Sequence, residues 1–363
     1  MLELERKKNY ILARLENAVN EGRKVYIYGC GELGKIVERA LGNFKIPVEA
    51  FCVDKEFYVG GTINGKIVLK IESVVEMATQ DNRPTIVIAF RDYDLQKLAN
   101  FEKKVEIINE DVFCFHTVNN QSDAWSEDFF KKYADKLSKV YDSLMDEKSH
   151  QCMKAFLYQK MTGEFKYLKN VYDLNQYNDS DIVDFNKIRA YIDCGAYDGD
   201  SFLSFTQNYQ KNTGKRYDGR AYLLEPDEKN YKKMVNNCSE YDNCIFCKVG
   251  AWNEKKSLIF SSEGTSSGVA ENGDERIEAD TIDNLTGKKA DFIKMDIEGA
   301  ELAALQGAKN TIRECHPILA ICVYHKCDDL WIISEYIKSI DSSYRLYLRA
   351  YSKYSQELVL YAV

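Results

Sequence analysis

Short apolar runs alternate with segments of helical periodicity over the first third of the chain. The runs VYIY (25–28), VEAFCV (48–53), PTIVIAF (84–90) and VEII (105–108) are strand-like, and helix-patterned stretches lie between them. Strands that alternate with helices are typical of a parallel sheet covered by helices. We therefore predict that residues 1–118 form a compact α/β domain.

The pattern changes between residues 119 and 185. Apolar positions recur there at helical spacing, tyrosine and lysine are frequent, and no strand-like run interrupts them. Gly163 is predicted to divide this stretch into two parts. We interpret the segment as a helical connector that covers one of its neighbours.

A second strand-and-helix series occupies residues 186–363. Its apolar runs are IRAYIDC, GRAYLLE, NCIFCKVG, DFIKMD, PILAICVY, YRLYLRAY and ELVLYAV. Helices are expected after Gly199, Pro226 and Gly299 and over residues 328–340. The last two runs are joined only by SKYSQ, which leaves no room for a crossover helix, so we predict that they pair antiparallel.

Charge and cysteine usage exclude several classes of protein. The net charge is −8 with scattered lysine pairs, which gives no electrostatic footprint for nucleic acid. The start of the chain is charged and helix-patterned rather than a signal peptide, and apolar runs of about seven residues are too short to span a membrane. Eleven cysteines, mostly inside apolar runs, favour reduced core thiols and a cytoplasmic location. We interpret the CxxC of Cys244 and Cys247 as two thiols in or beside a strand, rather than as a zinc site.

Two acidic residues close the first two runs of the second series. The first run delivers Asp193, after which the chain turns through Gly195 and Gly199 into a helix-patterned segment. Such glycines let the backbone approach a ligand closely, although a plain strand-to-helix turn is the alternative. The second run ends on Glu225, where a carboxylate can accept both hydroxyls of a ribose.

Three groups suited to acid–base chemistry follow the later runs. Asp296 and Glu298 come after FIKM, and His325 comes after ILAICVY. Open α/β sheets bind ligands at the carboxyl ends of their strands, so we predict catalytic roles for all three. The alternatives are helix caps for the acids and a backbone-bonded rim histidine. Two acids and a histidine can also hold a divalent metal, but we assign no metal ligand from the sequence.

These blocks resemble the FkbM family of S-adenosylmethionine-dependent methyltransferases. The similarity covers YIDCGAYDGD, LLEPDEKNY, VGAWNE, TIDNL, DFIKMDIEGAELAALQGAKNTI and HPILAICVYH, in the order of the family. It implies a class I, Rossmann-like methyltransferase domain with a C-terminal antiparallel hairpin over residues 186–363. It also implies S-adenosylmethionine as cofactor and a hydroxyl of a sugar, glycan, nucleotide-sugar or related small molecule as acceptor.

The resemblance assigns expected roles to individual positions. The methionine end of the cofactor would lie against Asp193, Gly195, Ala196, Tyr197 and Gly199. The ribose would lie against Glu225 and Pro226, and the adenine near Ala251 and Trp252. Asp296 would face both the cofactor and the acceptor, and Glu298 would lie beside it. Tyr197 and Asp198 depart from the Asn and small or apolar residue of many members, which changes the pocket wall. Tyr158, Tyr167 and Tyr177 of the connector are candidates for the acceptor pocket or for packing.

Lys294 lies in the middle of the apolar run FIKM. A lysine in a strand buried on both faces must find a partner or lose its charge. We predict that Lys294 pairs with an acid of a neighbouring strand or helix.

The N-terminal domain carries a fingerprint of its own. Gly29, Gly31 and Gly34 form G-x-G-x-x-G between a strand and a helix, and Asp54 closes the next strand. This segment resembles the small Rossmann-like domains of bacterial sugar-modifying enzymes. Its alternatives are a second nucleotide site or a scaffold that dimerises the chain or presents the substrate.

The sequence therefore predicts a cytoplasmic O-methyltransferase. The alternatives are N-methylation of an amino-sugar or amino acid, an NAD-dependent oxidoreductase that uses the N-terminal fingerprint, and a sensor with a decayed methyltransferase half. Five residues expected at the cofactor and acceptor are all present, which argues against decay: Asp193, Gly195, Gly199, Glu225 and Asp296.

Overall fold

The computed structural model divides the chain into two compact units. It describes residues 2, 4–5, 7–91, 93–115, 125–261, 268–269 and 275–363. The N-terminal unit comprises Glu3–Tyr133 and Lys154–Asn170, and the C-terminal unit comprises Ala134–Met153 and Val171–Val363. The predicted helical connector therefore contributes residues to both units. No helix in the described part of the chain is long and apolar enough to cross a membrane.

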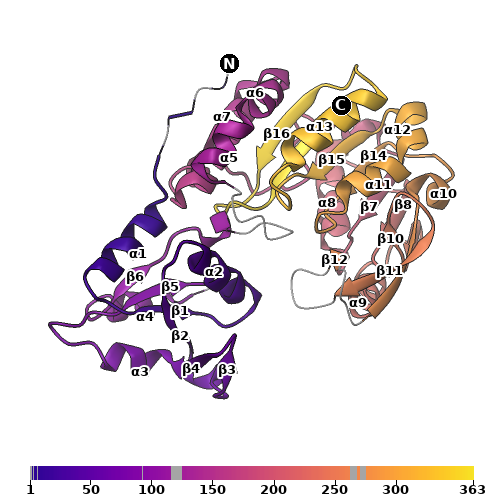
Figure 1. The fold of residues 1–363 in the computed structure, drawn as a ribbon. Coiled ribbons are helices and arrows are strands. Elements are labelled where there is room, and N and C mark those ends of the chain that lie inside the picture. The colour runs from indigo at the N-terminus through magenta and orange to yellow at the C-terminus, as the bar shows by residue number, and fades with distance from the viewer. Residues whose placement is uncertain are drawn as a thin grey trace. The chain divides into compact units, whose positions relative to one another are not determined.

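The N-terminal unit is built on a six-stranded sheet of order β3-β4-β2-β1-β5-β6 (Figure 1). Its strands are β1 (Val25–Tyr28), β2 (Val48–Val53), β3 (Thr62–Ile63), β4 (Lys66–Lys70), β5 (Thr85–Ile88) and β6 (Glu106–Ile108). All neighbours pair in parallel except β3 and β4. The four strands predicted from apolar runs are confirmed.

A short hairpin in this unit, formed by β3 and β4, was not predicted from the sequence. The turn between β3 and β4 is Asn64-Gly65, and both residues have positive φ, at 50° and 76°. Asn-Gly is a strong hairpin signal, but β3 has two residues and β4 has three apolar residues between two lysines, so the apolar runs are too short to indicate these strands.

Helices and buried side chains enclose both faces of this sheet. The α-helices are α1 (Tyr10–Asn20), α2 (Glu32–Asn43), α3 (Ile71–Glu76), α4 (Leu95–Phe101) and α5 (Glu127–Lys132). One apolar cluster joins α1 and α2 to the sheet and another joins α3 and α4 to it. Because both faces are covered, the central strands are continuously apolar rather than alternating.

The C-terminal unit contains a seven-stranded sheet of order β16-β17-β15-β14-β7-β8-β9. The strands are β7 (Ala190–Cys194), β8 (Arg220–Leu224), β9 (Cys244–Cys247), β14 (Phe292–Met295), β15 (Ile318–Cys322), β16 (Leu346–Ala350) and β17 (Leu358–Ala362). Six of them, including β16, run in the same direction, whereas β17 runs opposite and pairs antiparallel with both β15 and β16. The predicted antiparallel hairpin at the end of the chain is confirmed. The two cysteines of the CxxC are the first and last residues of β9, so they lie in a strand.

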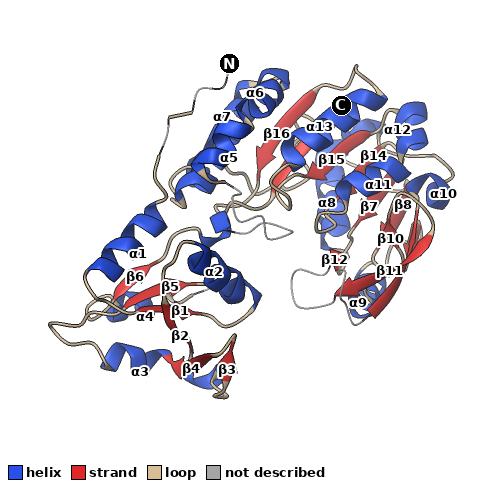
Figure 2. Cartoon of the chain, viewed as in Figure 1, coloured by secondary structure: helices blue, strands red, loops and turns tan. Residues whose placement is uncertain are grey.

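Helices of this unit follow the strands as the pattern predicted (Figure 2). They are α6 (Ala134–Ser143), α7 (Glu147–Thr162, shared between the units), α8 (Asp200–Thr213), α9 (Glu228–Asn237), α10 (Ile282–Thr286), α11 (Glu301–Gly307), α12 (Lys309–Cys315) and α13 (Asp329–Ile340).

A second sheet of the C-terminal unit was not predicted from the sequence. It has four strands in the order β10-β13-β11-β12. Its strands are β10 (Gly250–Ala251), β11 (Lys256–Ser261), β12 (Gly268–Val269) and β13 (Glu275–Asp280). Polar residues dominate β13, so it lacks the continuous apolar run of the main sheet.

A buried arginine fixes the first segment of the C-terminal unit to its sheet. Arg349 on β16 is 1% exposed and contacts Asp146 at 2.7 Å and Asp179 at 2.6 Å. Its guanidinium also donates to the hydroxyl of Ser149 at 2.9 Å. Arginine satisfies several acceptors at once, so this cluster joins three segments distant in sequence.

Candidate active site

The turn after β7 requires its glycines. Gly195 has φ 77°, and a Cβ there would lie 2.0 Å from the backbone oxygen of Asp296. Gly199 has φ 92°, and a Cβ there would lie 2.5 Å from Sγ of Cys238. Between them, Tyr197 also has a positive φ of 49° and an exposed side chain, whereas Ala196 is fully buried. The turn after β7 thus packs directly on the turn after β14, with backbone against backbone.

Lys294 is a buried partner of Asp193, which confirms the prediction made for it. Nζ lies 3.0 Å from Oδ1 of Asp193, and the two side chains are 3% and 0% exposed. The ammonium also donates to the carbonyl of Gly195 at 2.6 Å. Burial alone would lower the pKa of Lys294, but the charge of Asp193 outweighs it and raises that pKa. Oδ2 of Asp193 accepts from Ser201 and Tyr191, so this carboxylate is enclosed by protein groups.

Glu225 stands at the carboxyl end of β8, where its oxygens accept from backbone donors alone among the residues that the structure describes. Oε2 accepts from the N–H of Tyr197 and Oε1 from the N–H of Asp227, each at 2.9 Å. Burial raises the pKa of Glu225 to about 7, against the effect of these two donors. A carboxylate oxygen has room for a second donor, so each oxygen can still accept a ligand hydroxyl.

Trp252, which follows β10, has a buried donor. Pro226 lies next to Gly250 at the start of β10, and Ala251 on the same strand is buried. The indole Nε1 of Trp252 is buried and finds no hydrogen-bond partner among the described residues. Buried indole N–H groups are usually bonded, so this donor is available to a bound ligand. Gly307 packs directly against the backbone of Trp252, since a Cβ on Gly307 would lie 1.9 Å from the carbonyl oxygen of Trp252.

The two acids after β14 meet the histidine after β15. Nε2 of His325 lies 3.4 Å from Oδ1 of Asp296 and 3.6 Å from Oε2 of Glu298. Glu298 has φ 54° and the next residue, Gly299, has φ 91°, so the chain reverses sharply there. Adjacent parallel strands bring their carboxyl ends together, which is why residues distant in sequence meet.

Two tyrosines hold Asp296 in place. The hydroxyl of Tyr177 donates to Oδ2 at 2.9 Å and that of Tyr324 to Oδ1 at 3.3 Å. Tyr177 was a candidate for the acceptor pocket, and it lies at the acid cluster. The other two candidates, Tyr158 and Tyr167, belong to the N-terminal unit, where their rings stack with centroids 5.2 Å apart.

The charges of this cluster are strongly coupled. Burial would lower the pKa of His325, but the charge and hydrogen bond of Glu301, followed by the other two acids, raise it to about 10. Burial raises the pKa of Glu298 to about 7. Burial acts in the same direction on Asp296, but the charges of Lys294 and His325 outweigh it and lower that pKa.

Glu301 is a site residue that the sequence analysis did not single out. It is fully buried at the start of α11, and its Oε1 lies 3.0 Å from Nδ1 of His325. The same oxygen accepts from the N–H of Ile297 at 2.9 Å. In the sequence Glu301 is the third acid of DIEGAE, and a buried carboxylate cannot be distinguished there from an ordinary first-turn helix residue.

The fingerprint of the N-terminal unit has a different environment. A Cβ on Gly34 would lie 2.1 Å from the Gly29 oxygen, whereas one on Gly31 would meet no described atom within 4 Å. Asp54 accepts from the hydroxyl of Tyr28 at 2.7 Å and also contacts the ammonium of Lys97. Burial would raise the pKa of Asp54, but these two donors outweigh it and lower the pKa.

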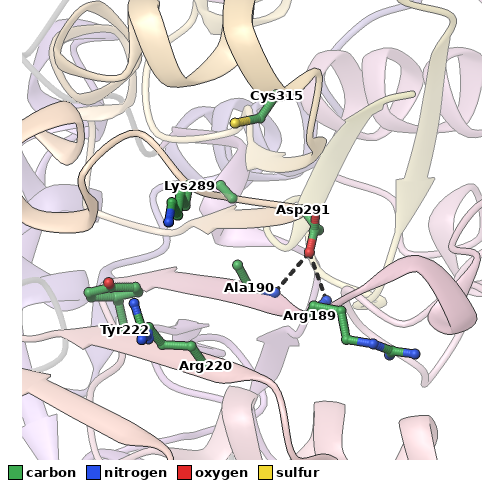
Figure 3. Close-up of a pocket in the computed structure, with 8 residues that line it drawn as sticks. Arg189, Ala190, Arg220, Tyr222, Lys289, Asp291 and Cys315 are labelled. Carbon is green, nitrogen blue, oxygen red and sulfur yellow. Dashed lines mark hydrogen bonds between the residues drawn. The ribbon is translucent and has the colours of Figure 1, made fainter.

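A surface cavity lies at the opposite edge of the C-terminal sheet (Figure 3). It measures about 450 Å³ and is lined by Arg189, Ala190, Arg220, Tyr222, Lys289, Ala290, Asp291 and Cys315. The carboxylate of Asp291 accepts from the N–H groups of Arg189 and Ala190 there. These residues precede or begin their strands, so the cavity is separate from the acid cluster at the carboxyl ends.

Residues 193–348 match the family model of the methyltransferase FkbM domain. The matched segment lies within the C-terminal unit. The protein is therefore an S-adenosylmethionine-dependent methyltransferase, and the resemblance noted in the sequence is confirmed. No curated protein matches the chain.

A solved structure shows the same fold over nearly the whole chain. The chain is similar to the methyltransferase FkbM of Methylobacillus flagellatus KT, with 24% identity, a TM-score of 0.72 and coverage of 96% of this chain and 93% of that one. Weaker similarities are to a putative rRNA-methylase from Clostridium thermocellum (10% identity, TM-score 0.30, coverage 55% and 90%). A further weak similarity is to Aeropyrum pernix fibrillarin with natively bound S-adenosyl-L-methionine, with 12% identity, a TM-score of 0.29 and coverage of 49% of this chain and 66% of that one.

Proposed function

We propose that the protein transfers the methyl group of S-adenosylmethionine to a hydroxyl of a sugar, glycan, nucleotide-sugar or related small molecule. The observation that carries this proposal is the cluster of Asp296, Glu298 and His325 at the carboxyl ends of β14 and β15. A hydroxyl is a weak nucleophile with a high pKa, so its methylation benefits from groups that remove its proton. The cluster offers such groups beside the glycine turn of the cofactor side.

The residues on the cofactor side fit S-adenosylmethionine. The oxygens of Glu225 can accept the ribose hydroxyls, and the unpartnered Nε1 of Trp252 can donate to the adenine. The Gly195 turn, which packs on the backbone of Asp296, would present its own backbone to the methionine end. Asp193 is enclosed, so we expect it to act indirectly, through Lys294 and the turn. The bound cofactor supplies an electrophilic methyl group.

On the acceptor side, the protein's part is to orient the hydroxyl and take up its proton. Tyr177 and Tyr324 fix Asp296, so its position is set before the acceptor arrives. His325 is 1% exposed, which shows that the inner side of the cluster excludes water. Orientation and exclusion of water are the main requirements when the donor is already reactive.

The test separates methyl transfer from cofactor binding. We expect Asp296→Asn and Glu298→Gln each to lower turnover by about 10²-fold or more, the range of general-base contributions. Calorimetry should show S-adenosylmethionine affinity within about threefold of the unchanged protein, at 1.4 kcal/mol per decade. Glu228→Gln makes the same chemical change in an exposed ion pair on α9 and serves as the control. Loss of cofactor binding in the first two variants would reassign both acids to the cofactor.

The acceptor class is tested with a panel of sugars, nucleotide-sugars, amino-sugars and amino acids. Methylated product is identified by mass spectrometry, and its position by nuclear magnetic resonance. Methyl transfer to oxygen supports the proposal. Transfer only to nitrogen would overturn it in favour of N-methylation.

A further inference from the structure

We infer that the acid cluster is a binding site for one divalent cation such as Mg²⁺ or Mn²⁺. The inference rests on the proposed function, because the cation would bind the acceptor oxygen. Asp296 and His325 would each give one ligand atom, and together with Glu301, which lies behind the imidazole, they form a group whose candidate atoms lie within 4.8 Å of one another. Glu298 adds a further carboxylate 3.6 Å from the same imidazole.

The distances around Nε2 suit ligands of a common ion better than hydrogen bonds. Nε2 of His325 lies 3.4 Å from Asp296 and 3.6 Å from Glu298, beyond or at the limit of a hydrogen bond. Neighbouring ligands of an ion with bonds of about 2.0–2.2 Å lie roughly 3.0–3.5 Å apart. Small side-chain rotations would therefore let one ion contact both carboxylates and the imidazole.

A buried polar atom gives independent support. Nε2 of His325, the ring nitrogen that faces Asp296 and Glu298, is buried and makes no hydrogen bond to any described residue. Buried polar groups are normally bonded, so this atom indicates a missing partner. The imidazole is 1% exposed, and its Nε2 points at the two carboxylates.

Glu301 would act as the positioning residue behind the histidine. Its Oε1 lies 3.0 Å from Nδ1, on the side of the ring away from Asp296 and Glu298. A proton on Nδ1 shared with Glu301 leaves the lone pair of Nε2 for the ion. Histidine ligands commonly have such a carboxylate behind them, which fixes the tautomer and the ring plane.

The cation would account for an otherwise unusual accumulation of acids. Asp296, Glu298 and Glu301 converge on one histidine inside the fold. A divalent ion compensates this charge and acts as a Lewis acid toward a bound hydroxyl oxygen, lowering its pKa. The acceptor's proton can then pass at neutral pH to a carboxylate oxygen of the cluster, which need not be a strong base.

Mn²⁺ binding to the full-length protein tests the inference directly. After removal of metals with a chelating resin, we expect about one Mn²⁺ per chain, measured by loss of the free-ion electron paramagnetic resonance signal. Asp296→Asn and Glu298→Gln should each weaken Mn²⁺ binding at least tenfold, and Glu228→Gln should leave it unchanged. Circular dichroism and S-adenosylmethionine binding show whether each variant is folded.

The outcomes distinguish this inference from the proposed function. Methyl transfer to a hydroxyl by metal-free protein that binds no Mn²⁺ would overturn the cation site and leave the proposed function standing. Mn²⁺ binding that depends on the cluster, in a protein that methylates only amines, would support the site and overturn the proposed function. Equal Mn²⁺ binding by all variants would place the ion elsewhere and overturn the inference.

Discussion

The two units use the same local motif with different results. In each, a strand runs into a glycine turn and a helix, and the next strand ends in a carboxylate, Asp54 in one unit and Glu225 in the other. Asp54 is engaged by the side chains of Tyr28 and Lys97. Among the described residues Glu225 receives two backbone N–H groups and no side-chain donor, and burial, which outweighs the lowering effect of these donors and of the Lys294 charge, raises its pKa.

This difference shows what a glycine fingerprint leaves open. The glycines permit the strand to approach the helix, as the packing of Gly34 on Gly29 illustrates. Whether the carboxylate can bind a ribose depends on its other partners. An acid already paired with a lysine gains little from a ligand hydroxyl, whereas a buried acid without a cation gains a charge-assisted bond.

The largest expected effect comes from the buried ion pair of the C-terminal unit. Lys294→Met leaves Asp193 buried without its cation and should cost about 3–5 kcal/mol of stability. Lys97→Met removes the corresponding, partly exposed pair of Asp54 and should cost only about 0–1 kcal/mol. Differential scanning calorimetry of both variants measures the contrast. Similar losses in the two would show that burial does not separate the pairs.

The next effect concerns the glycines of the two turns. Gly195→Ala places a methyl group against the Asp296 carbonyl at a positive φ, so we expect about 2–4 kcal/mol of destabilisation and loss of cofactor binding. Gly31→Ala meets open space and should change stability by less than about 1 kcal/mol. Thermal unfolding and S-adenosylmethionine titration check both. A tolerated Gly195→Ala would contradict the close packing of the two turns.

Cofactor affinity should separate the two carboxylates directly. Glu225→Ala should weaken S-adenosylmethionine binding about tenfold or more, equivalent to at least about 1.4 kcal/mol. Asp54→Ala is the matched control and should leave that affinity unchanged. Isothermal titration calorimetry with S-adenosylmethionine and with NAD measures both effects. NAD binding that is lost in Asp54→Ala would establish a second nucleotide site after all.

The smallest effect is a pH dependence of the same binding step. The pKa of Glu225 is raised to about 7, so the carboxylate becomes charged as the pH rises from 6 to 8. The charged form accepts ribose hydroxyls better, so affinity should increase over this range, by up to about tenfold if only that form binds. Glu225→Gln should flatten the profile. An unchanged slope in that variant would assign the dependence to another group.

The hydrophobic pattern was sufficient for most of the fold. Continuous apolar runs identified the central strands of both main sheets, because strands buried on two faces are apolar at every position and stand out in the sequence. The short link SKYSQ predicted the antiparallel hairpin. The β3–β4 hairpin and the sheet of β10 to β13 were missed, because their strands are short or polar and owe their stability to pairing in the folded unit.

For the candidate site, the sequence by itself determined which groups end the strands. Asp193, Glu225, Asp296 and His325 each follow an apolar run, and parallel strands place such residues at one edge. The partner of Lys294 was also predictable in kind, since a buried lysine needs an acid.

Only the tertiary structure decided how these groups are paired. It placed Glu301 behind His325 and Tyr177 on Asp296, contacts that join residues from separate helices, loops and strands. It also distinguished Asp54, bound to a lysine, from Glu225, bound to backbone alone. The physical reason is that burial and the neighbouring charges set the behaviour of a carboxylate, and both arise only when distant segments pack together.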